Sequence, residues 1–230
     1  MRIAFGILAV VALVHLTGQL AGPTLLAHST QVLLMPALAG VLLAGTTAPR
    51  GRLVHLVLVA LLFSWLGDSV PRFTTGDTSF LLMVGFFLSA QLVYVVALWP
   101  YRHASLLRRP AALVPYGAFG ILIVVLCAPQ TGALLPAVAV YAAVIVAMAV
   151  LATGLGRLAG TGAVVFVASD ALIALDTFGV MTLPGQGFWV MSSYITAQTL
   201  LIMAVRHRAQ QAPAQAGPVG QGPAEQGPML

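Results

Sequence analysis

The sequence predicts an all-α protein that crosses a membrane about eight times, with both chain ends in the cytoplasm. Three observations lead to this prediction. Hydrophobic residues make up 60% of the 230 residues and charged residues only 7%, whereas a water-soluble domain carries about 25% charged residues. The apolar residues gather in runs of about the 20 residues that a membrane-spanning helix needs. The arginines fall almost entirely into alternate loops.

Charged residues, Pro and Gly divide the apolar sequence into eight runs. The loops between the runs are short, so we expect neighbouring helices to pack antiparallel. The start of the chain, Met1-Arg2 followed by an apolar run, also fits a signal peptide. The topology closes only if this segment is kept as the first helix. We expect spans near residues 3–21, 24–46, 53–70, 80–99, 111–128, 133–153, 160–178 and 187–205.

The arginines support both the number of spans and their orientation. With eight spans, all basic residues except Arg72 fall on one side of the membrane, and the positive-inside rule makes that side cytoplasmic. A net charge of +5 that is spread thinly over loops indicates membrane topology, so we expect no nucleic-acid partner. All basic residues are Arg and none is Lys, which is typical of a GC-rich genome. We expect the plasma membrane of a bacterium.

The chain divides into a membrane domain and a tail. Residues 1–208 form the predicted transmembrane helical domain. Residues 209–230 are rich in Pro, Gly, Gln and Ala, and such a segment buries too little apolar surface to fold alone. We expect it to be a disordered cytoplasmic tail.

Several kinds of site are excluded by composition and motif. The single cysteine, Cys127, allows neither a disulfide framework nor a Cys-based metal site. The histidines show no i,i+4 pairing, so we expect no metal. The sequence has no Gly-rich phosphate loop, no nucleophile elbow and no HExxH segment.

Two acidic residues are the candidate catalytic groups. Asp170 falls near the middle of the predicted seventh span, and Asp68 falls in the last turns of the third, before Pro71. An ionisable group inside a bilayer costs at least about 2.5–3.5 kcal/mol, so it normally faces a cavity or a partner. Two alternatives stay open: Asp170 could make a structural hydrogen bond between helices, and Asp68 could lie at the membrane interface.

Five uncharged polar residues lie at comparable depth. Gln91 and Tyr94 are three residues apart, and Tyr194 and Gln198 are four apart, so each pair shares one face of its helix. Gln31 lies in the outer half of the predicted second span. Each residue alone is more often an interhelical packing contact than a ligand. Together they predict one polar pocket in the outer half of the membrane, with a dry inner half.

Three segments in the predicted third, seventh and eighth spans match patterns of one family. They read Ser-Trp-Leu-Gly-Asp at 64–68, Gly-Ala-Val-Val-Phe-Val-Ala-Ser-Asp-Ala-Leu at 162–172, and Tyr-Ile-Thr-Ala-Gln at 194–198. Tyr141 and Met148 in the sixth span fit as well. In this order the segments resemble the lysoplasmalogenase family, the YhhN-like membrane proteins. The resemblance covers nearly the whole membrane region and excludes the tail.

Three positions depart from the family pattern. Gln31 and Val32 stand where the family usually has Lys and Pro, near the start of the second span. Gln91 stands three residues before Tyr94, where the family often has His. Both candidate catalytic Asp residues remain in place.

The resemblance implies hydrolysis of the vinyl ether bond of lysoplasmalogens, which yields a fatty aldehyde and a glycerophospho-base. Protonation of the terminal alkene carbon generates an oxocarbenium ion; water adds, and the hemiacetal collapses. This chemistry needs a protonated acid and a carboxylate, but no metal or other cofactor. Two neighbouring carboxyl groups can divide these roles, and Asp170 and Asp68 would form the pair, with the acid unassigned.

The resemblance also implies how a substrate is held. The partners would be a lysophospholipid or other ether lipid, together with membrane lipid. The residues that would orient water and the glycerol or headgroup are Gln31, Gln91, Tyr94, Tyr194 and Gln198.

Other functions stay open beside this hydrolase. Intramembrane Asp residues also serve proton relays in carriers, although carriers often show repeats and helices broken near the membrane midplane, and the sequence shows little of either. A non-catalytic, lipid-binding member of the family is a further alternative. An intramembrane aspartyl protease also needs two Asp residues, but its Tyr-Asp and Gly-x-Gly-Asp motifs are absent.

Overall fold

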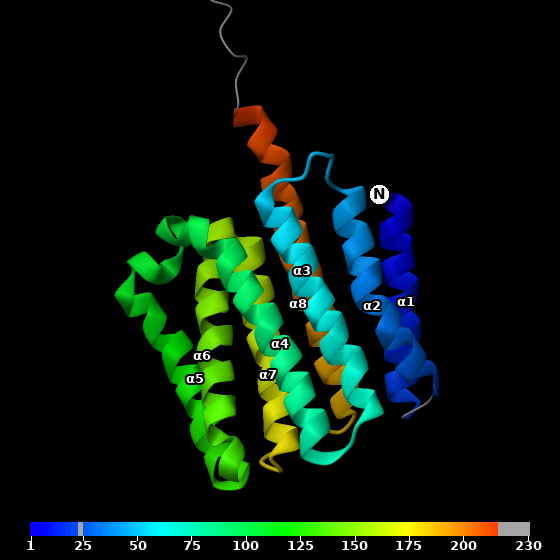
Figure 1. Cartoon of the computed structure of the whole chain (residues 1–230), viewed down its shortest axis with the longest axis vertical. Helices are drawn as coiled ribbons and strands as arrows, with labels where there is room; N and C mark the ends of the chain where they lie inside the picture. The colour runs from blue at the N-terminus through cyan, green and yellow to red at the C-terminus, as the bar shows by residue number, and fades with distance from the viewer. Residues whose placement is uncertain (23–24, 216–230) are drawn as a thin grey trace, which may run out of the picture.

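Eight α-helices run up and down beside one another in the computed structural model, which describes residues 1–22 and 25–215, with side chains up to residue 211 (Figure 1). These residues contain no β-strand, so the predicted all-α class is confirmed. The α-helices are α1 (Arg2–Leu20), α2 (Leu25–Ala44), α3 (Arg52–Ser69), α4 (Gly76–Leu98), α5 (Pro110–Thr131), α6 (Leu135–Ala152), α7 (Arg157–Thr177) and α8 (Gln186–Gln215). Short 3-10 helices in the connections are η1 (Val70–Phe73), η2 (Trp99–Ala104), η3 (Leu106–Arg108), η4 (Gly132–Leu134) and η5 (Thr153–Leu155).

Seven helical segments of the described chain are long and apolar enough to cross a membrane. The number is one lower than the number of α-helices because α5, η4 and α6 follow one another without a non-helical residue between them, so that Pro110–Leu155 counts as one segment. This segment reverses its direction at Gly132, where φ is +51°, and its two halves lie side by side in Figure 1. The chain is therefore a polytopic helical membrane protein, while its number of spans and its orientation stay predictions.

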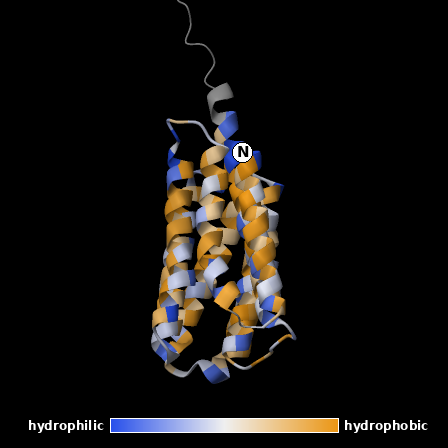
Figure 2. Cartoon of the chain, turned by 90° about the vertical axis from the view of Figure 1, so that its right-hand side faces the viewer, coloured by the Kyte–Doolittle hydropathy of each residue, from blue (hydrophilic) through white to orange (hydrophobic). Residues whose placement is uncertain are grey.

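The outer surface of the bundle is apolar along its length. Figure 2 shows hydrophobic residues over the middle of the helices and hydrophilic residues gathered near both ends. Large aliphatic side chains point outward; Leu13, Val114 and Ile121 are 65%, 67% and 67% exposed. Such a continuous apolar surface would drive aggregation in water, but it suits contact with lipid chains.

The two ends of the bundle differ in charge. α1 begins and α8 ends at the same end of the molecule (Figure 1), and the α2–α3, α4–α5 and α6–α7 connections lie there as well because the helices alternate in direction. All arginines of the sequence lie in described residues, and all except Arg72 belong to this end. We call it the basic end. The opposite, far end carries Arg72 in η1.

The buried core lies between α2, α3, α4, α6, α7 and α8, while α1 and α5 stand at the two edges (Figure 1). α7 and α8 approach each other closely at Gly162. A Cβ atom there would lie 2.9 Å from Cβ of Leu200 and 3.0 Å from the carbonyl oxygen of Ala197. Because real Cβ atoms do not come that close, a larger residue would push α8 away from α7.

A proline in α2 fixes how α3 packs against that helix. Pro36 has no N–H, so the carbonyl four residues earlier, that of Val32, lacks its helical partner. The indole N–H of Trp65 on α3 donates to this carbonyl at 2.9 Å. Because a backbone carbonyl is costly to leave unpaired inside a membrane protein, this bond positions α3 on α2 directly beside Asp68.

The largest differences from the predicted boundaries are at the start of α4 and at the end of α8. α4 begins at Gly76, ahead of the expected residue 80, so Asp77 lies in the first turn of the helix. α8 continues through Gln215, past the expected start of the tail at residue 209. The mostly polar residues 206–211 continue the helix beyond the apolar run, which is why hydropathy alone ends the span early. The rest of the expected tail, residues 216–230, lies outside the described residues.

Candidate active site

Two pairs of polar side chains meet between α3 and α8. Ser64 and Asp68 are four residues apart on α3, and Tyr194 and Gln198 are four apart on α8, so each pair shares one helix face. Since the helices run in opposite directions, Tyr194 lies opposite Asp68 and Gln198 lies opposite Ser64. The hydroxyl of Tyr194 donates to Oδ2 of Asp68 at 3.2 Å, and Nε2 of Gln198 donates to Oγ of Ser64 at 3.4 Å.

Asp68 accepts a hydrogen bond on each carboxyl oxygen. Nε2 of Gln31, on α2, donates to Oδ1 at 3.0 Å, and Tyr194 donates to Oδ2. The Tyr194 hydroxyl also lies 3.4 Å from Sδ of Met35. Asp68 is 8% exposed, so three helices enclose it. We call Gln31, Asp68 and Tyr194 the Asp68 cluster.

Arg72 closes the Asp68 cluster on the far end. Its Nε donates to the backbone oxygen of Asp68 at 2.9 Å, its Nη2 donates to Oε1 of Gln31 at 2.7 Å, and its Nη1 donates to the backbone oxygen of His28. Gln31 therefore connects the guanidinium to the carboxyl group, with its oxygen toward Arg72 and its nitrogen toward Asp68. The Arg72 side chain remains exposed.

A second polar group lies deeper in the bundle, nearer the basic end. The hydroxyl of Tyr94, on α4, donates to Oε1 of Gln198 at 2.8 Å. Together with the Ser64 contact, this gives the Gln198 amide a partner for both its oxygen and its nitrogen. Gln198 and Tyr94 are buried, and their bond joins α4 to α8. We call Ser64, Tyr94 and Gln198 the Gln198 cluster.

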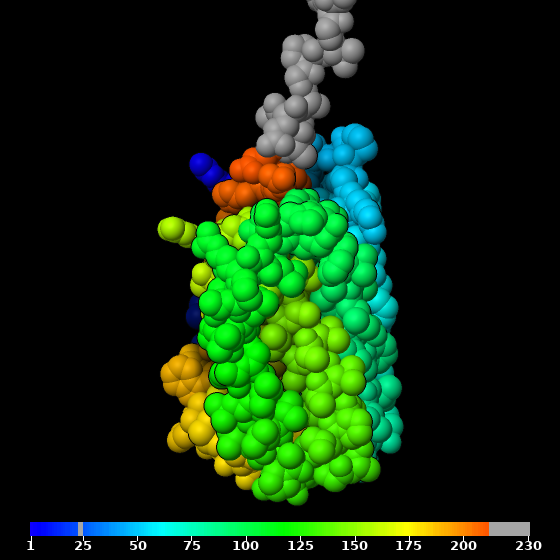
Figure 3. All heavy atoms as spheres, turned by 90° about the vertical axis from the view of Figure 1, so that its left-hand side faces the viewer, coloured from blue at the N-terminus to red at the C-terminus, as the bar shows by residue number. Residues whose placement is uncertain are grey.

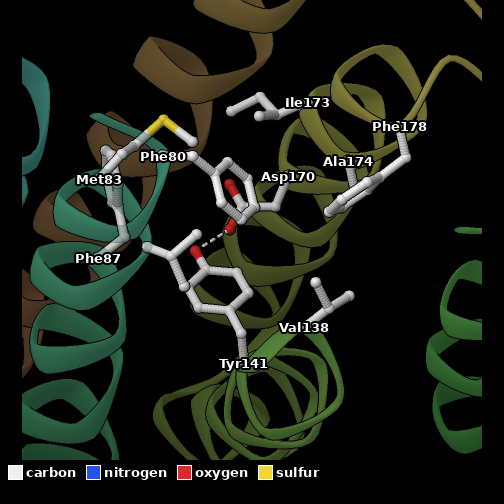
Figure 4. A pocket seen from close by; sticks show the side chains of 10 residues that line it. Phe80, Met83, Phe87, Val138, Tyr141, Asp170, Ile173, Ala174 and Phe178 are labelled. Carbon is white, nitrogen blue, oxygen red and sulfur yellow. Dashed lines mark hydrogen bonds between the residues drawn. The ribbon is translucent and has the colours of Figure 1, made fainter. Parts of the chain in front are cut away.

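Asp170 pairs with Tyr141, the residue that gives α6 its polar side chain. The Tyr141 hydroxyl donates to Oδ2 of Asp170 on α7, and Figure 4 shows the two groups pointing toward each other. The neighbouring Ser169 turns to the other side of α7 and donates to the backbone oxygen of Val190 on α8 at 2.9 Å. This second bond holds α7 against α8 while Asp170 faces α6. We call Tyr141 and Asp170 the Asp170 pair.

A narrow apolar cavity of about 60 Å³ borders the Asp170 pair between α4, α6 and α7 (Figure 4). Its remaining walls are carbon side chains. The residues around the Asp170 pair in this cavity are Phe80, Met83, Val84, Phe87, Val138, Ile173, Ala174 and Phe178.

α5 covers the other side of the Asp170 pair loosely. A cavity of about 50 Å³ between α5, α6 and α7 also touches Tyr141 and Asp170. It shares Phe119, Val146 and Val167 with a wider apolar groove of about 320 Å³ that continues toward the basic end. Figure 3 views this side, with α5 in green, and shows a hollow beside that helix. Two apolar spaces thus meet at Asp170.

The Asp68 cluster and the Asp170 cavity share a wall. The ring of Phe87 packs edge-on against the Tyr194 ring, with centroids 5.9 Å apart, and it also lines the cavity at Asp170. Gly67 leaves room for this ring, because a Cβ atom there would lie 2.9 Å from two Phe87 ring carbons. The structure thus brings both predicted catalytic residues to one region.

Gln91 lies on α4, three residues before Tyr94. Its side chain is completely buried and makes no hydrogen bond of normal geometry to the described part of the chain. The five predicted binding residues therefore divide: Gln31 and Tyr194 contact Asp68, Tyr94 and Gln198 form the deeper cluster, and Gln91 joins neither group through a hydrogen bond among the described residues.

Three site residues were not among the predicted catalytic and binding residues: Ser64, Tyr141 and Arg72. Ser64 lies four residues before Asp68, in the Ser-Trp-Leu-Gly-Asp segment. Tyr141 is a lone polar side chain in an otherwise apolar helix, and that isolation is a signal that the sequence offers. Arg72 is the lone arginine of the far end, and in the sequence it is the exception to the positive-inside pattern. Its contact with Gln31 across 41 positions of the sequence has no local sequence signal.

Comparison with known proteins agrees with the motifs. The YhhN family matches residues 26–205. The protein named lysoplasmalogenase TMEM86B of Rattus norvegicus is 34% identical over 178 residues, which cover 76% of this chain and 72% of the relative. The Mus musculus protein of that name is 32% identical over 173 residues, covering 74% of this chain and 71% of the relative. No solved structure matches the chain.

The Homo sapiens lysoplasmalogenase TMEM86B is 29% identical over 157 residues, which cover 68% of this chain and 66% of the relative. The family match includes every residue of the Asp68 cluster, the Gln198 cluster and the Asp170 pair, together with Arg72. With a family match over most of its length and these relatives, the chain belongs to the YhhN family.

Proposed function

We propose that this protein is a membrane hydrolase that cleaves the vinyl ether bond of lysoplasmalogens. The observation that carries the proposal is the meeting of two carboxyl groups, the buried one of Asp68 on α3 and the partly buried one of Asp170 on α7, on the two sides of the Phe87 and Tyr194 rings. The family, and relatives named lysoplasmalogenase, support this reaction over others that use two carboxyl groups.

The proposed reaction needs a proton, a stabilised cation and water. An acid protonates the alkene carbon that is not bonded to oxygen, and the alkene carbon that is bonded to oxygen becomes part of an oxocarbenium ion. Water adds to this carbon and releases a proton to a base, and the hemiacetal then collapses to a fatty aldehyde and the free glycerol hydroxyl. Positioned acid–base groups contribute about 10²–10⁴-fold to such a step. No cofactor takes part in this scheme.

Asp170 is the proposed proton donor. One of its oxygens accepts from Tyr141, and the residue borders apolar cavities on both sides. Apolar surroundings favour the neutral form of a carboxyl group, and the same surroundings are where a hydrocarbon alkene would lie. The acid and the carbon that it protonates are thereby brought to the same place.

Asp68 is the proposed carboxylate that stabilises the cation and accepts the proton from water. It receives hydrogen bonds on both oxygens from neutral donors, and such bonds favour the charged form of a carboxyl group. Gln31 and Tyr194 orient this carboxylate. The Gln198 cluster holds α4, α3 and α8 together behind it.

The alkyl chain has an apolar place to bind. The groove of about 320 Å³ beside α5 is lined by apolar side chains and by Tyr116, and it leads toward the Asp170 pair through shared lining residues. The substrate would be a lysophospholipid or other ether lipid taken from the surrounding membrane, which we propose is a bacterial plasma membrane.

Aldehyde release from a lysoplasmalogen by the purified protein in a maltoside detergent tests the proposal. We expect release by the wild-type protein and a loss of about 100-fold or more in Asp170→Asn and in Asp68→Asn. Asp176→Asn is the matched control, because Asp176 lies on the same helix as Asp170 but pairs with Thr182 in the α7–α8 connection. In deuterated water the released aldehyde should carry deuterium on the carbon next to the aldehyde group.

The outcomes separate the alternatives. Full activity of either Asp→Asn variant of the pair would contradict its assigned role. Binding of a lysophospholipid by a folded wild-type protein that releases no aldehyde would favour a non-catalytic, lipid-binding member of the family. Proton uptake coupled to solute movement in liposomes, without hydrolysis, would favour a proton-coupled carrier.

A further inference from the structure

We propose that Arg72 binds the phosphate of a lysophospholipid headgroup and thereby places the glycerol beside Asp68. This inference rests on the proposed function, because it names the part of the substrate that the far end of the same site recognises. The phosphate is the shared chemistry of two sources, a lipid headgroup and free inorganic phosphate, and the experiment below distinguishes them.

The position of Arg72 is the first argument. Among the described residues it is the arginine of the far end, while every other arginine belongs to the basic end. A lone cation beside a buried polar cluster, at an end where headgroups lie, has no topological role under the positive-inside rule. Phosphate diesters carry a negative charge, and arginine is the side chain best suited to bind them.

The second argument is that the Arg72 guanidinium is held in place by hydrogen bonds and still has N–H donors free for a ligand. Arginine has five N–H donors, and three hydrogen bonds are formed here, to the backbone oxygens of Asp68 and His28 and to the side chain of Gln31. The backbone of η1 is held as well, since Ser79 on α4 donates to the oxygen of Pro71 at 2.9 Å. The exposed Arg72 side chain therefore offers its remaining donors from a fixed position, which lowers the entropy cost of binding.

The third argument is the spacing between the two charged groups. A single amide, that of Gln31, bridges Arg72 and Asp68, with contacts of 2.7 Å to Nη2 and 3.0 Å to Oδ1. In a lysophospholipid the phosphate and the ether oxygen are attached to opposite ends of a three-carbon glycerol. A glycerol that lies along the Gln31 amide would therefore bring the ether oxygen toward Asp68 when the phosphate is on Arg72.

Binding of non-cleavable lipids tests this inference without hydrolysis. The probes are a 1-O-alkyl lysophospholipid, the corresponding 1-O-alkylglycerol without phosphate, and inorganic phosphate, each measured by the shift of thermal unfolding in a maltoside detergent. We expect the wild-type protein to bind the lysophospholipid about 10-fold or more tightly than the alkylglycerol. In Arg72→Gln this preference should disappear, while the affinity for the alkylglycerol stays the same.

Further variants distinguish phosphate binding from a purely structural role. Arg157→Gln, at the basic end, is the matched control and should keep the preference. Arg72→Lys should keep part of it, because it keeps the charge but not the planar fork. Adding Gln31→Lys to Arg72→Gln should restore it in part, since position 31 directly contacts the guanidinium and a Lys there returns a cation to the same place.

Turnover provides a second measurement. With a cleavable lysoplasmalogen, Arg72→Gln should raise KM about 10-fold or more and change kcat little; with 1-alkenylglycerol it should change neither. Equal losses for both substrates, or for both binding probes, would mean that Arg72 only supports Asp68, and the inference would be wrong. If inorganic phosphate stabilised the wild-type protein but not Arg72→Gln, and the lysophospholipid gave no such difference, the assignment to a lipid headgroup would be wrong. If the proposed hydrolysis is wrong but this inference is right, the binding preference persists without aldehyde release.

Discussion

The two carboxyl groups of the site have opposite surroundings, although they lie on the two sides of one aromatic wall. Asp68 is enclosed by polar side chains from α2 and α8, and both of its oxygens accept hydrogen bonds. Asp170 has a hydrogen bond from Tyr141 and otherwise borders apolar cavities. The same residue type is thus given two environments by the helices around it.

This difference suggests that the two carboxyl groups have different chemical roles in one site. A carboxyl group with two donors is arranged to carry a charge, while one in apolar surroundings is arranged to carry a proton. The polar side also faces the far end with Arg72, and the apolar side continues into the groove beside α5. The arrangement matches a lipid with a polar end and a hydrocarbon end.

Replacing the tyrosine that hydrogen-bonds to each carboxyl group is the most direct test of this assignment of acid and carboxylate. We expect Tyr141→Phe to lower kcat about 10- to 100-fold, because the hydroxyl stabilises the carboxylate that forms as Asp170 gives up its proton, and a hydrogen bond to a charged group contributes about 1.5–3 kcal/mol. Tyr194→Phe should lower kcat less, since Gln31 still holds Asp68. Aldehyde release measured for both variants checks this order, and a larger loss in Tyr194→Phe would reverse the assignment of the acid.

A substitution at Gly67 would disturb the Phe87 ring, which forms the wall between the Asp68 cluster and the cavity at Asp170. A methyl group at this position would collide with the Phe87 ring, so we expect Gly67→Ala to lower the free energy of unfolding by about 1–3 kcal/mol. Thermal unfolding in detergent measures this effect. Gly40→Ala on α2 is the control, because a Cβ there has no neighbour within 4 Å. Equal stability of the two variants would show that the ring moves aside freely.

The Asp68 side depends on how α3 sits on α2. Trp65→Phe would leave the Val32 carbonyl without the donor that replaces the missing N–H of Pro36. An unpaired buried carbonyl costs about 1–3 kcal/mol, so we expect a loss of stability in that range and a rise in KM. A double variant, Trp65→Phe with Pro36→Ala, should recover part of the stability, because Ala restores the helical N–H. Failure to recover would show that Trp65 acts through packing alone.

The smallest effect is expected at Gln91. Its buried amide makes no hydrogen bond of normal geometry to the described residues, so replacing it with an apolar side chain of similar size removes a desolvation cost and loses little. We expect Gln91→Leu to unfold at the same temperature or a higher one. A clear loss of stability would indicate a partner for the amide, and a loss of activity alone would make Gln91 part of the reaction.

Much of the fold and part of the site were predictable because they follow from local rules. Helix α3 spans Arg52–Ser69, close to the expected 53–70, since the length of an apolar run is set by the thickness of a membrane. Asp68 and Asp170 stood out because charges inside apolar runs are costly. The spacing of Tyr194 and Gln198 correctly placed them on one face, which meets Asp68 and Ser64.

The pairing of these groups was not predictable, because it joins residues far apart in the sequence. Neither Tyr141 with Asp170 nor Arg72 with Gln31 shares a helix, so no periodicity relates them. Gln31, which departs from the Lys of the family pattern, has a guanidinium at its side chain oxygen. The sequence shows the loss of one cation; the fold shows another cation beside the same position.

Hydropathy and charge act locally along each helix, so the amino-acid sequence alone indicates a membrane-embedded helical protein and the carboxyl groups that lie within it. The environment of each carboxyl group, the meeting of the apolar cavities at Asp170 and the contact of Arg72 with Gln31 are visible only in the folded protein. Those features depend on which helix faces pack together, and that packing is set by close contacts such as Gly67 with Phe87 and Trp65 with Val32.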